Sequence, residues 1–405
     1  MRSISGETPQ PGGDSEGRHF RLLAILCLCG FATSISWRAL DPMLPVMATN
    51  LDVPLSEVVL LASAYSLPFA LMQLVFGPLG DALGKTRLIR FSLGMVAASL
   101  LLMAVAPDFH TVFGARILSG AFAGGINPVA IALLGETIAL HHRQVALGRY
   151  LAAMIGGQMI GALYAGLLVD LIGWRWVVAI AAVVVATVCV LAIRFLDSTR
   201  ETRSRPSLPK VAASYRMIFA RPGAFLLMAI LAAEGILILG IIPFVAGMLL
   251  ERLGSGSAQA GIVIGCFAIG GMTFGFFVRR LVEGLGPWNM VRVGGVIAGL
   301  GLLGAAVPIH WVVTAGCFFG IGFGFYTMHN SIMLRVTELA PHARGAGVSV
   351  GAFAFTAGQG IGPILWTLVL PGLGYLTMFL AAGLLTALLG FAAAKLLRAR
   401  MSEAG

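Results

Sequence analysis

The sequence carries little charge for its length. Only 11% of the 405 residues are Asp, Glu, Lys or Arg, whereas 58% are hydrophobic, and the mean hydropathy is +0.94. A soluble chain of this size needs far more charged surface, so the composition excludes nuclear, cytosolic and secreted proteins. It indicates an integral membrane protein.

Metal-binding and redox motifs are missing as well. The five cysteines lie within apolar runs and show neither metal-ligand spacing nor a CxxC pair, and there is no HExxH. We therefore expect no metal site, no catalytic residue and no cofactor. A membrane-embedded enzyme or sensor is the remote alternative, which formation of a reaction product by the purified protein would support.

What the sequence has instead is a series of long apolar runs. A membrane-spanning helix needs about 20 apolar residues. The runs lie at 22–47, 58–76, 88–106, 112–139, 147–171, 176–195, 225–250, 260–278, 291–309, 312–334, 348–370 and 376–394. Their number predicts an all-α membrane protein with twelve transmembrane helices.

The basic residues are distributed unevenly between the connecting loops. With both termini inside, only Arg175 and Arg252 of the 27 Lys and Arg residues fall in external loops, while Arg38 and Arg116 fall within spans. This asymmetry places both termini in the cytoplasm of a cell with a cytoplasmic (inner) membrane. The formal net charge of +10 is thus a topology signal and an attraction to membrane lipids, and we expect no nucleic-acid partner.

A hydrophilic stretch with Pro206 and Pro209 divides the runs into two sets of six. The expected organisation is a disordered cytoplasmic tail at 1–20, a six-helix bundle at 21–195, a cytoplasmic linker at 196–221, a second bundle at 222–396 and a tail at 397–405.

The two halves also repeat in sequence at a shift of about 200 positions. Ordered matches join Gly157, Gln158, Ile160 and Gly161 to Gly358, Gln359, Ile361 and Gly362, and Gly120 and Gly124 to Gly320 and Gly324. Parallel six-span halves related by an axis along the membrane normal characterise one large class of transporters.

These patterns resemble the major facilitator superfamily. The segment Gly77–Arg87 (GPLGDALGKTR) is similar to the superfamily's loop between spans 2 and 3, and Arg116 with Gly120 and Gly124 resembles its span 4 motif. The closest subgroup is the twelve-span drug:proton antiporters and sugar or drug efflux proteins. Features shared with it are Gly157, Gly161, Gly166 and GWRW at 173–176 in span 5, and Asp41, Pro42, Leu44 and Pro45 at the end of span 1. One departure is Ala162, which stands where the span 5 pattern usually has Pro.

The Gly77–Arg87 segment is expected to form a conformational gate rather than a nucleotide site. It ends like a P-loop, but Leu79 stands where that loop needs Gly, so ATP is not the expected energy source. Glycines would let spans 2 and 11 approach closely, and Asp81 would face the N-terminus of span 11 when the inner gate is shut. The gate residues are Gly77, Gly80, Asp81, Gly84 and Arg87. A solvated hairpin is the alternative.

Few charges fall inside the spans, where each ionised side chain costs about 2.5–3.5 kcal/mol on insertion scales. Arg38 and Asp41 lie one turn apart in span 1, and Arg116 lies at a similar depth in span 4. An Asp41–Arg116 pair is geometrically reasonable. The resemblance implies that Asp41 exchanges protons, with Arg38 and Arg116 adjusting its proton affinity. A permanent ion pair that merely orients two helices is the alternative.

Glu234 lies about twelve residues into span 7, close to mid-membrane, with no basic residue near it in that span. It is expected to be protonated, to meet a cationic substrate or to act as a second proton site. Otherwise it forms a hydrogen bond within the second half.

Polar residues of the spans that would line a central cavity complete the candidate site. The predicted substrate-binding residues are Trp37, Asn127, Gln158, Glu234, Tyr326, His329, Asn330 and Gln359.

The sequence thus predicts a monomeric secondary transporter that exchanges a small amphiphilic organic substrate for protons, driven by the proton gradient. A proton symporter or facilitator for uptake of a small organic solute is the alternative within the same fold.

Overall fold

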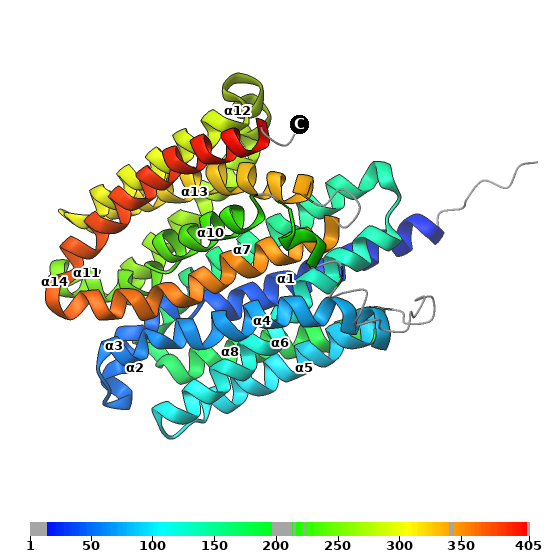
Figure 1. Cartoon of the computed structure of the whole chain (residues 1–405). Coiled ribbons are helices and arrows are strands. Elements are labelled where there is room, and N and C mark those ends of the chain that lie inside the picture. Colours follow the sequence, from blue (N-terminus) through cyan, green and yellow to red (C-terminus); the bar gives the residue numbers. More distant parts are fainter. Residues whose placement is uncertain (1–13, 197–212, 214–215, 222, 340–343, 403–405) are drawn as a thin grey trace, which may run out of the picture.

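The computed structural model describes residues 14–196, 213, 216–221, 223–339 and 344–402, and the regular elements within these ranges are all helices (Figure 1). The first half of the chain contains α1 (Asp14–Arg38), η1 (Asp41–Met43), α2 (Leu44–Leu51), α3 (Leu55–Val58), α4 (Leu60–Leu83), α5 (Lys85–Ala104), α6 (Phe109–Thr137), α7 (Leu140–Ile172) and α8 (Trp174–Phe195). The second half contains α10 (Ala224–Glu234), η2 (Gly235–Leu239), η3 (Ile242–Phe244), α11 (Val245–Leu253), α12 (Ser257–Ala306), α13 (Trp311–Leu339) and α14 (Arg344–Ser402).

Two of these helices are each divided by a glycine. The backbone is non-helical at Gly286 inside α12 and at Gly374 inside α14, both with a φ of 69°. Gly84 between α4 and α5 and Gly173 between α7 and α8 also have a positive φ, which glycine adopts without steric cost. Gly84 and Gly286 occupy corresponding places in the two halves, as do Gly173 and Gly374.

The two halves of the chain also repeat the contacts in which a glycine of one helix packs on the backbone of another. A side chain at Gly157 would meet the carbonyl of Phe31, and one at Gly358 would meet the carbonyl of Ala232. Both pairs fit a shift of 201 positions. The short helices η1 and η3, each with a proline at its second position, are related by the same shift.

The predicted match between Gly120 and Gly320 is shifted by two residues in the structure. Gly120 packs against the Tyr65 carbonyl, and the residue that makes the same contact in the second half is Gly322, against Phe267. The predicted partner, Gly320, has open space beside it. The sequence offers several glycines at two-residue spacing here, and only the packing identifies the equivalent one.

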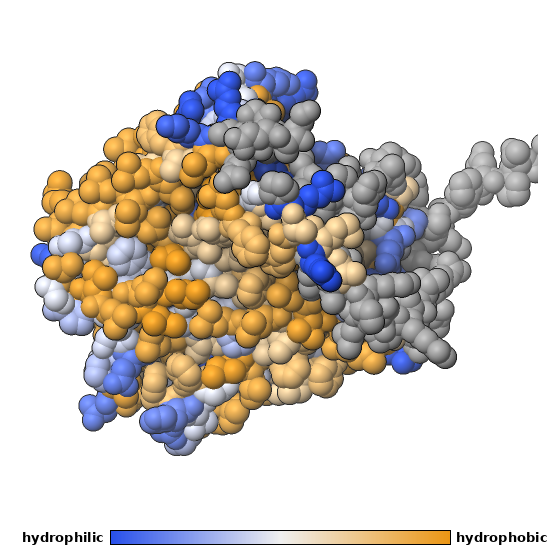
Figure 2. Space-filling view, viewed as in Figure 1, coloured by the Kyte–Doolittle hydropathy of each residue, from blue (hydrophilic) through white to orange (hydrophobic). Residues whose placement is uncertain are grey.

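The face of the molecule seen in Figure 2 has a broad apolar area, with hydrophilic patches toward its edges. Large apolar side chains that lie open on the surface include Phe276, Leu171 and Leu368. Within the described ranges, ten helices are long and apolar enough to cross a membrane, α12 and α14 being counted once each. The chain is therefore a multi-pass membrane protein.

The first and second halves of the chain meet at several points. Beside a small pocket that they line together with residues of α2 and α11, Ser257 Oγ donates a hydrogen bond to Asp170 Oδ1 at 3.1 Å. Gly166 of α7 and Gly261 of α12 bring their backbones together next to this bond. Farther along the helices, Gly360 of α14 packs against Leu67 of α4.

The predicted boundaries of the polar segments differ in part from the structure. Helix α1 begins at Asp14, ahead of the predicted boundary at residue 20, and Arg21 bonds to the Gly17 carbonyl within it. Helix α14 continues to Ser402, past the predicted boundary at 396. Most of the predicted linker, including Pro206 and Pro209, lies outside the described residues.

Candidate functional site

The end of α1 brings two opposite charges together inside the apolar region. Helix α1 ends at Arg38, and the chain turns into the short helix η1, which begins at Asp41 and has Pro42 in its first turn. Arg38 Nη1 lies 3.1 Å from Asp41 Oδ2, and the two side chains are only 4% and 6% exposed. Their proximity agrees with the sequence prediction, although the two residues belong to different helices and not to one face of a continuous span.

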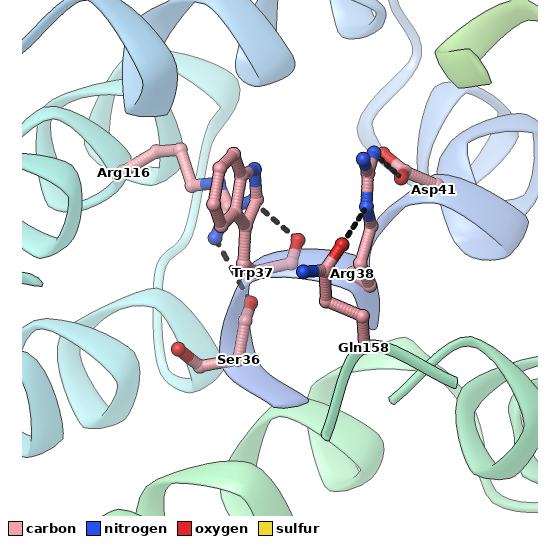
Figure 3. Close-up of polar contacts among 6 residues, drawn as sticks. All are labelled: Ser36, Trp37, Arg38, Asp41, Arg116 and Gln158. Atoms are coloured by element: carbon pink, nitrogen blue, oxygen red, sulfur yellow. Dashed lines mark hydrogen bonds and ion pairs between the residues drawn. The ribbon is translucent and has the colours of Figure 1, made fainter. Parts of the chain in front are cut away.

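Arg38 is also held from α7. Its Nε donates to Oε1 of Gln158 at 3.2 Å, so that the guanidinium lies between the amide and the carboxylate (Figure 3). Gln158 therefore contacts the ionic pair directly and is not an isolated cavity residue. For Oε1 of its partner in the repeat, Gln359, the described part of the chain supplies no hydrogen-bond donor.

Arg116 does not pair with Asp41, which corrects the predicted partnership. Its Nη1 and Nη2 donate to the carbonyls of Ser36 at 3.1 Å and Trp37 at 2.9 Å (Figure 3). The last carbonyls of a helix lack intrahelical partners, and the end of α1 therefore offers acceptors to this guanidinium. Arg116 is 1% exposed, and its two bonds hold the C-terminal end of α1, next to Arg38 and Asp41.

An aromatic group covers this arginine. The Arg116 guanidinium lies 4.2 Å from the ring centre of Tyr65, and the Trp37 ring lies 5.4 Å from Tyr65 and 5.0 Å from Phe69. Sequence reasoning selected Trp37 and missed Tyr65 and Phe69. Tyr65 and Phe69 are four residues apart in a predicted span, so they lie on one helix face, and this spacing could have identified them as a pair. In the structure they pack against Gly120 and Gly124.

A second polar pair joins α10 and α13. Glu234 Oε2 lies 2.7 Å from His329 Nδ1, although 95 residues separate them in the chain. The Glu234 side chain is fully buried and that of His329 is 20% exposed. The structure thus brings together two residues predicted separately.

Aromatic rings surround this histidine too. Its ring centre lies 5.1 Å from Phe325 and 4.5 Å from Phe355. Tyr326 packs edge-on against Phe325 at 4.9 Å, and it lies close enough to Arg38 for an electrostatic interaction. The two polar pairs therefore belong to one region between the halves of the chain.

The remaining predicted substrate residues have different surroundings. Asn127 accepts a hydrogen bond from the Tyr150 hydroxyl at 2.8 Å, a contact that holds α6 to α7. Gln359 is 4% exposed, and Asn330 is exposed. Asn127 therefore bonds within the protein, where it holds α6 to α7.

The predicted gate is organised around a residue that was not assigned to it. Lys85 Nζ lies 2.6 Å from Asp81 Oδ1 and 3.0 Å from Glu136 Oε1, linking the ends of α4 and α6. Gly84 provides the positive φ between α4 and α5, and Gly80 packs on Val129. Gly77 has open space beside it, and Arg87 is exposed. The predicted partner of Asp81, the N-terminus of span 11, is the start of α14 at Arg344. The ion-pair partner of Asp81 in the structure is Lys85.

In the described part of the chain, no three His, Cys, Asp or Glu side chains are grouped as metal ligands.

Comparison with known sequences identifies the family. The sequence profile of the Major Facilitator Superfamily matches residues 26–363. The chain belongs to this superfamily. It is a transporter, not an enzyme.

The similar proteins include several with efflux or resistance names. The chain is 31% identical over 266 residues to the puromycin resistance protein Pur8 of Streptomyces alboniger, covering 59% of this chain and 51% of that protein. It is 27% identical over 363 residues to the multidrug efflux pump LfrA of Mycolicibacterium smegmatis, covering 81% and 71%. It is 27% identical over 190 residues to the methyl viologen resistance protein SmvA of Salmonella typhimurium, covering 47% and 38%. The chain thus spans about half of the length of Pur8.

Proposed function

We propose that this superfamily member is a proton-coupled antiporter that exports small amphiphilic organic compounds by alternating access. In this proposal the chain crosses the inner membrane twelve times, because Gly286 and Gly374 divide α12 and α14 into two spans each. The spans form two six-helix bundles with both termini in the cytoplasm. The protein works as a monomer and draws on the proton gradient without a cofactor.

The observation that carries the proposal is the buried Arg38–Asp41 pair. A carboxylate inside the membrane is stable when a guanidinium compensates its charge, and it takes up a proton when that compensation weakens. Arg38 is shared between Asp41 and Gln158, which come from different helices, α1/η1 and α7. A relative movement of these helices changes the bonds of Arg38 and hence the proton affinity of Asp41.

The direction of transport is inferred from the relatives. Pur8 and SmvA are named for resistance, and LfrA is named as a multidrug efflux pump. Resistance by transport requires removal of the compound from the cell. Puromycin and methyl viologen are organic molecules with cationic groups, so amphiphilic cations are the first substrates to test.

The residues around the two polar pairs fit such compounds. Trp37 packs on the buried rings of Tyr65 and Phe69, and Phe355 packs on the buried ring of Phe325. Trp37 and Phe355 are themselves partly exposed. Small-molecule sites combine apolar walls with a small number of placed polar groups. The proposal takes the α2–α3–α11 end as external, so that the Asp170–Ser257 bond helps to close that side while substrate enters from the cytoplasm.

The direction of the driving pH gradient tests this function. Purified protein in proteoliposomes receives external ethidium, a fluorescent amphiphilic cation, while valinomycin and potassium hold the membrane potential at zero. An antiporter accumulates ethidium when the lumen is acidic, because protons leave as ethidium enters. Accumulation only with an acidic exterior would establish symport, and accumulation that ignores the gradient would establish a facilitator. Protein-free vesicles provide the background.

A further inference from the structure

A small pocket lies between the two halves of the chain, beside the hydrogen bond from Ser257 to Asp170. The first half contributes residues of η1, α2 and α7 to its wall, and the second half contributes residues of α11 and of the start of α12. Its volume is about 170 Å³. Because each half forms only part of the wall, the pocket is complete only while these ends of the two halves lie together.

The volume limits what the pocket can hold. A cavity of about 150 Å³ accommodates a benzene molecule, whereas drug-sized compounds occupy pockets of about 300–1,000 Å³. The pocket is therefore too small for a compound such as ethidium, and it has room for an organic molecule with a single ring.

Much of the wall is apolar. Pro42, Pro45, Val46 and Leu250 are among the residues that line the pocket. Burial of apolar surface against such a wall is favourable, whereas a small inorganic cation needs several oxygen ligands in place of its hydration shell. The wall thus favours a ligand with an apolar body over a bare metal ion.

The polar side chains of the pocket offer mainly hydrogen-bond acceptors. The Ser257 hydroxyl donates its proton to Asp170 Oδ1 at 3.1 Å, and the Thr49 hydroxyl donates to the Pro45 carbonyl at 3.2 Å. Both hydroxyls therefore have only lone pairs left to offer, and an ionised carboxylate has no donor. The Ser255 hydroxyl can rotate to donate or to accept. A ligand that donates hydrogen bonds complements this set.

The pocket also carries a negative charge. Asp170 belongs to none of the ion pairs formed by the described residues. Its carboxylate adjoins the glycine of the pocket wall, since a methyl group built on Gly256 would lie 3.6 Å from Oδ2. The loops that the proposed topology places outside contain more acidic residues than arginines, namely Asp52, Glu57, Asp108, Asp170 and Glu251 against Arg175 and Arg252. A cation is therefore attracted to this end of the molecule and to the pocket.

We propose that this pocket binds a small primary ammonium compound whose apolar body is no larger than one ring. The ammonium group donates hydrogen bonds to Asp170 and to the hydroxyl oxygens, and the body lies against Pro42, Pro45 and Leu250. The inference goes beyond the proposed function, because this ligand is neither the exported compound nor the proton.

Binding in this pocket favours the conformation seen in the structure. A ligand that contacts both halves stabilises the state in which their ends meet, and it has no complete site when they separate. Pro42 directly follows Asp41 in η1, so the ligand also contacts the element that carries the proposed proton site. A small amine bound here therefore restrains the opening of this end.

Calorimetric titration of the purified full chain in an uncharged detergent at neutral pH tests the site, with benzylammonium as the probe. Wild type should bind one benzylammonium per chain. Benzyl alcohol, which has the same ring but no charge, should bind at least about tenfold more weakly because it cannot pair with the carboxylate. Naphthylmethylammonium keeps the charge but has two rings, and it should also bind more weakly because it exceeds the volume. Partition into detergent would give the opposite order, since the larger ring system is more apolar.

Asp170→Asn removes the charge and keeps an oxygen that accepts the bond from Ser257. It should weaken benzylammonium binding about tenfold. Asp52→Asn is the matched control, because Asp52 is exposed at the end of α2 and does not line the pocket. Its φ of 54° is one that asparagine tolerates, and the variant should bind as wild type does.

Gly261→Ala tests whether the site needs both halves. The added methyl group would lie 2.6 Å from the Ala162 carbonyl oxygen and force α7 and α12 apart, although Gly261 does not line the pocket. Benzylammonium binding should fall about threefold or more, because the complete pocket is less populated. Gly275→Ala on the same helix meets nothing within 4 Å and should leave binding unchanged. Size-exclusion chromatography checks that each variant is folded.

Several results would overturn the inference. Wild type that binds no benzylammonium, or that binds benzyl alcohol or naphthylmethylammonium as tightly, has no such site. Wild-type affinity in folded Asp170→Asn would exclude the carboxylate as the anchor of the ammonium group, and wild-type affinity in folded Gly261→Ala would contradict a site shared by the two halves. None of these measurements involves transport, so the proposed antiport function stands or fails separately.

Discussion

The Arg38 guanidinium and the Asp41 carboxylate lie 3.1 Å apart across the break between α1 and η1. Helix α1 ends at Arg38 and η1 begins at Asp41, so the two side chains belong to different elements. Arg116 anchors this break by bonding to the Ser36 and Trp37 carbonyls. In the proposed antiporter, this contact would connect proton binding at Asp41 to the packing of α1 against α6.

Arg116→Lys should impair transport while leaving the protein folded. A lysine has a single ammonium group and cannot bond both carbonyls while lying over Tyr65, and each lost charge-assisted bond costs about 1.5–3 kcal/mol. We expect transport of ethidium in proteoliposomes to fall about tenfold or more. The control is Arg175→Lys, because Arg175 also lies over a ring, that of Trp174, and bonds to the Ala106 carbonyl away from the site. An equal loss in both variants would contradict the anchoring role.

Gly124→Ala should destabilise the protein. The added methyl group would collide with the backbone of Phe69, where α6 and α4 touch, and overpacking of this kind costs about 1–3 kcal/mol. Thermal unfolding in detergent should occur at a lower temperature than in wild type. Gly114→Ala on the same helix meets nothing within 4 Å and should be neutral or slightly stabilising. Identical melting of the two variants would rule out this contact as a structural constraint.

Asp108→Ala should remove a pH-dependent contribution to the stability of α6. Asp108 caps the helix, and the Thr111 backbone N–H that bonds to its carboxylate holds the pKa of this carboxyl below its usual range. A lowered pKa means that the stabilisation is complete above the ordinary value near 4 and is lost as the pH falls through the folded value. The difference in melting temperature between wild type and Asp108→Ala should thus shrink on acidification below about pH 4.

Asp108→Asn is the companion variant. Its amide oxygen still caps the helix but does not titrate, so the difference between Asn and Ala should be independent of pH. A pH-dependent difference between these two variants would show that another group is responsible.

Much of the fold follows from the sequence because apolar length and loop charge are local properties. The helices follow from apolar runs, and the repeat follows from residues that match at a fixed shift. The proximity of Arg38 to Asp41 follows from their separation of three residues in the sequence. The partner of Arg116 depends on where α1 ends, since the freed carbonyls compete with Asp41 for the guanidinium. The contact between Glu234 and His329 depends on the packing of two helices far apart in the chain, and a single sequence holds no signal for it. The register of Gly120 with Gly322 was likewise decided by packing.

The proton coupling of Asp41 is the central claim, and the substrate-driven proton flux of Asp41→Asn tests it most directly. Wild-type proteoliposomes with a pH indicator in the lumen should become less acidic when external ethidium is added, with the membrane potential clamped at zero. Asp41→Asn, matched in fold and in ethidium binding, should show no such flux because the amide carries no exchangeable charge. A proton flux equal to that of wild type in Asp41→Asn would contradict the account.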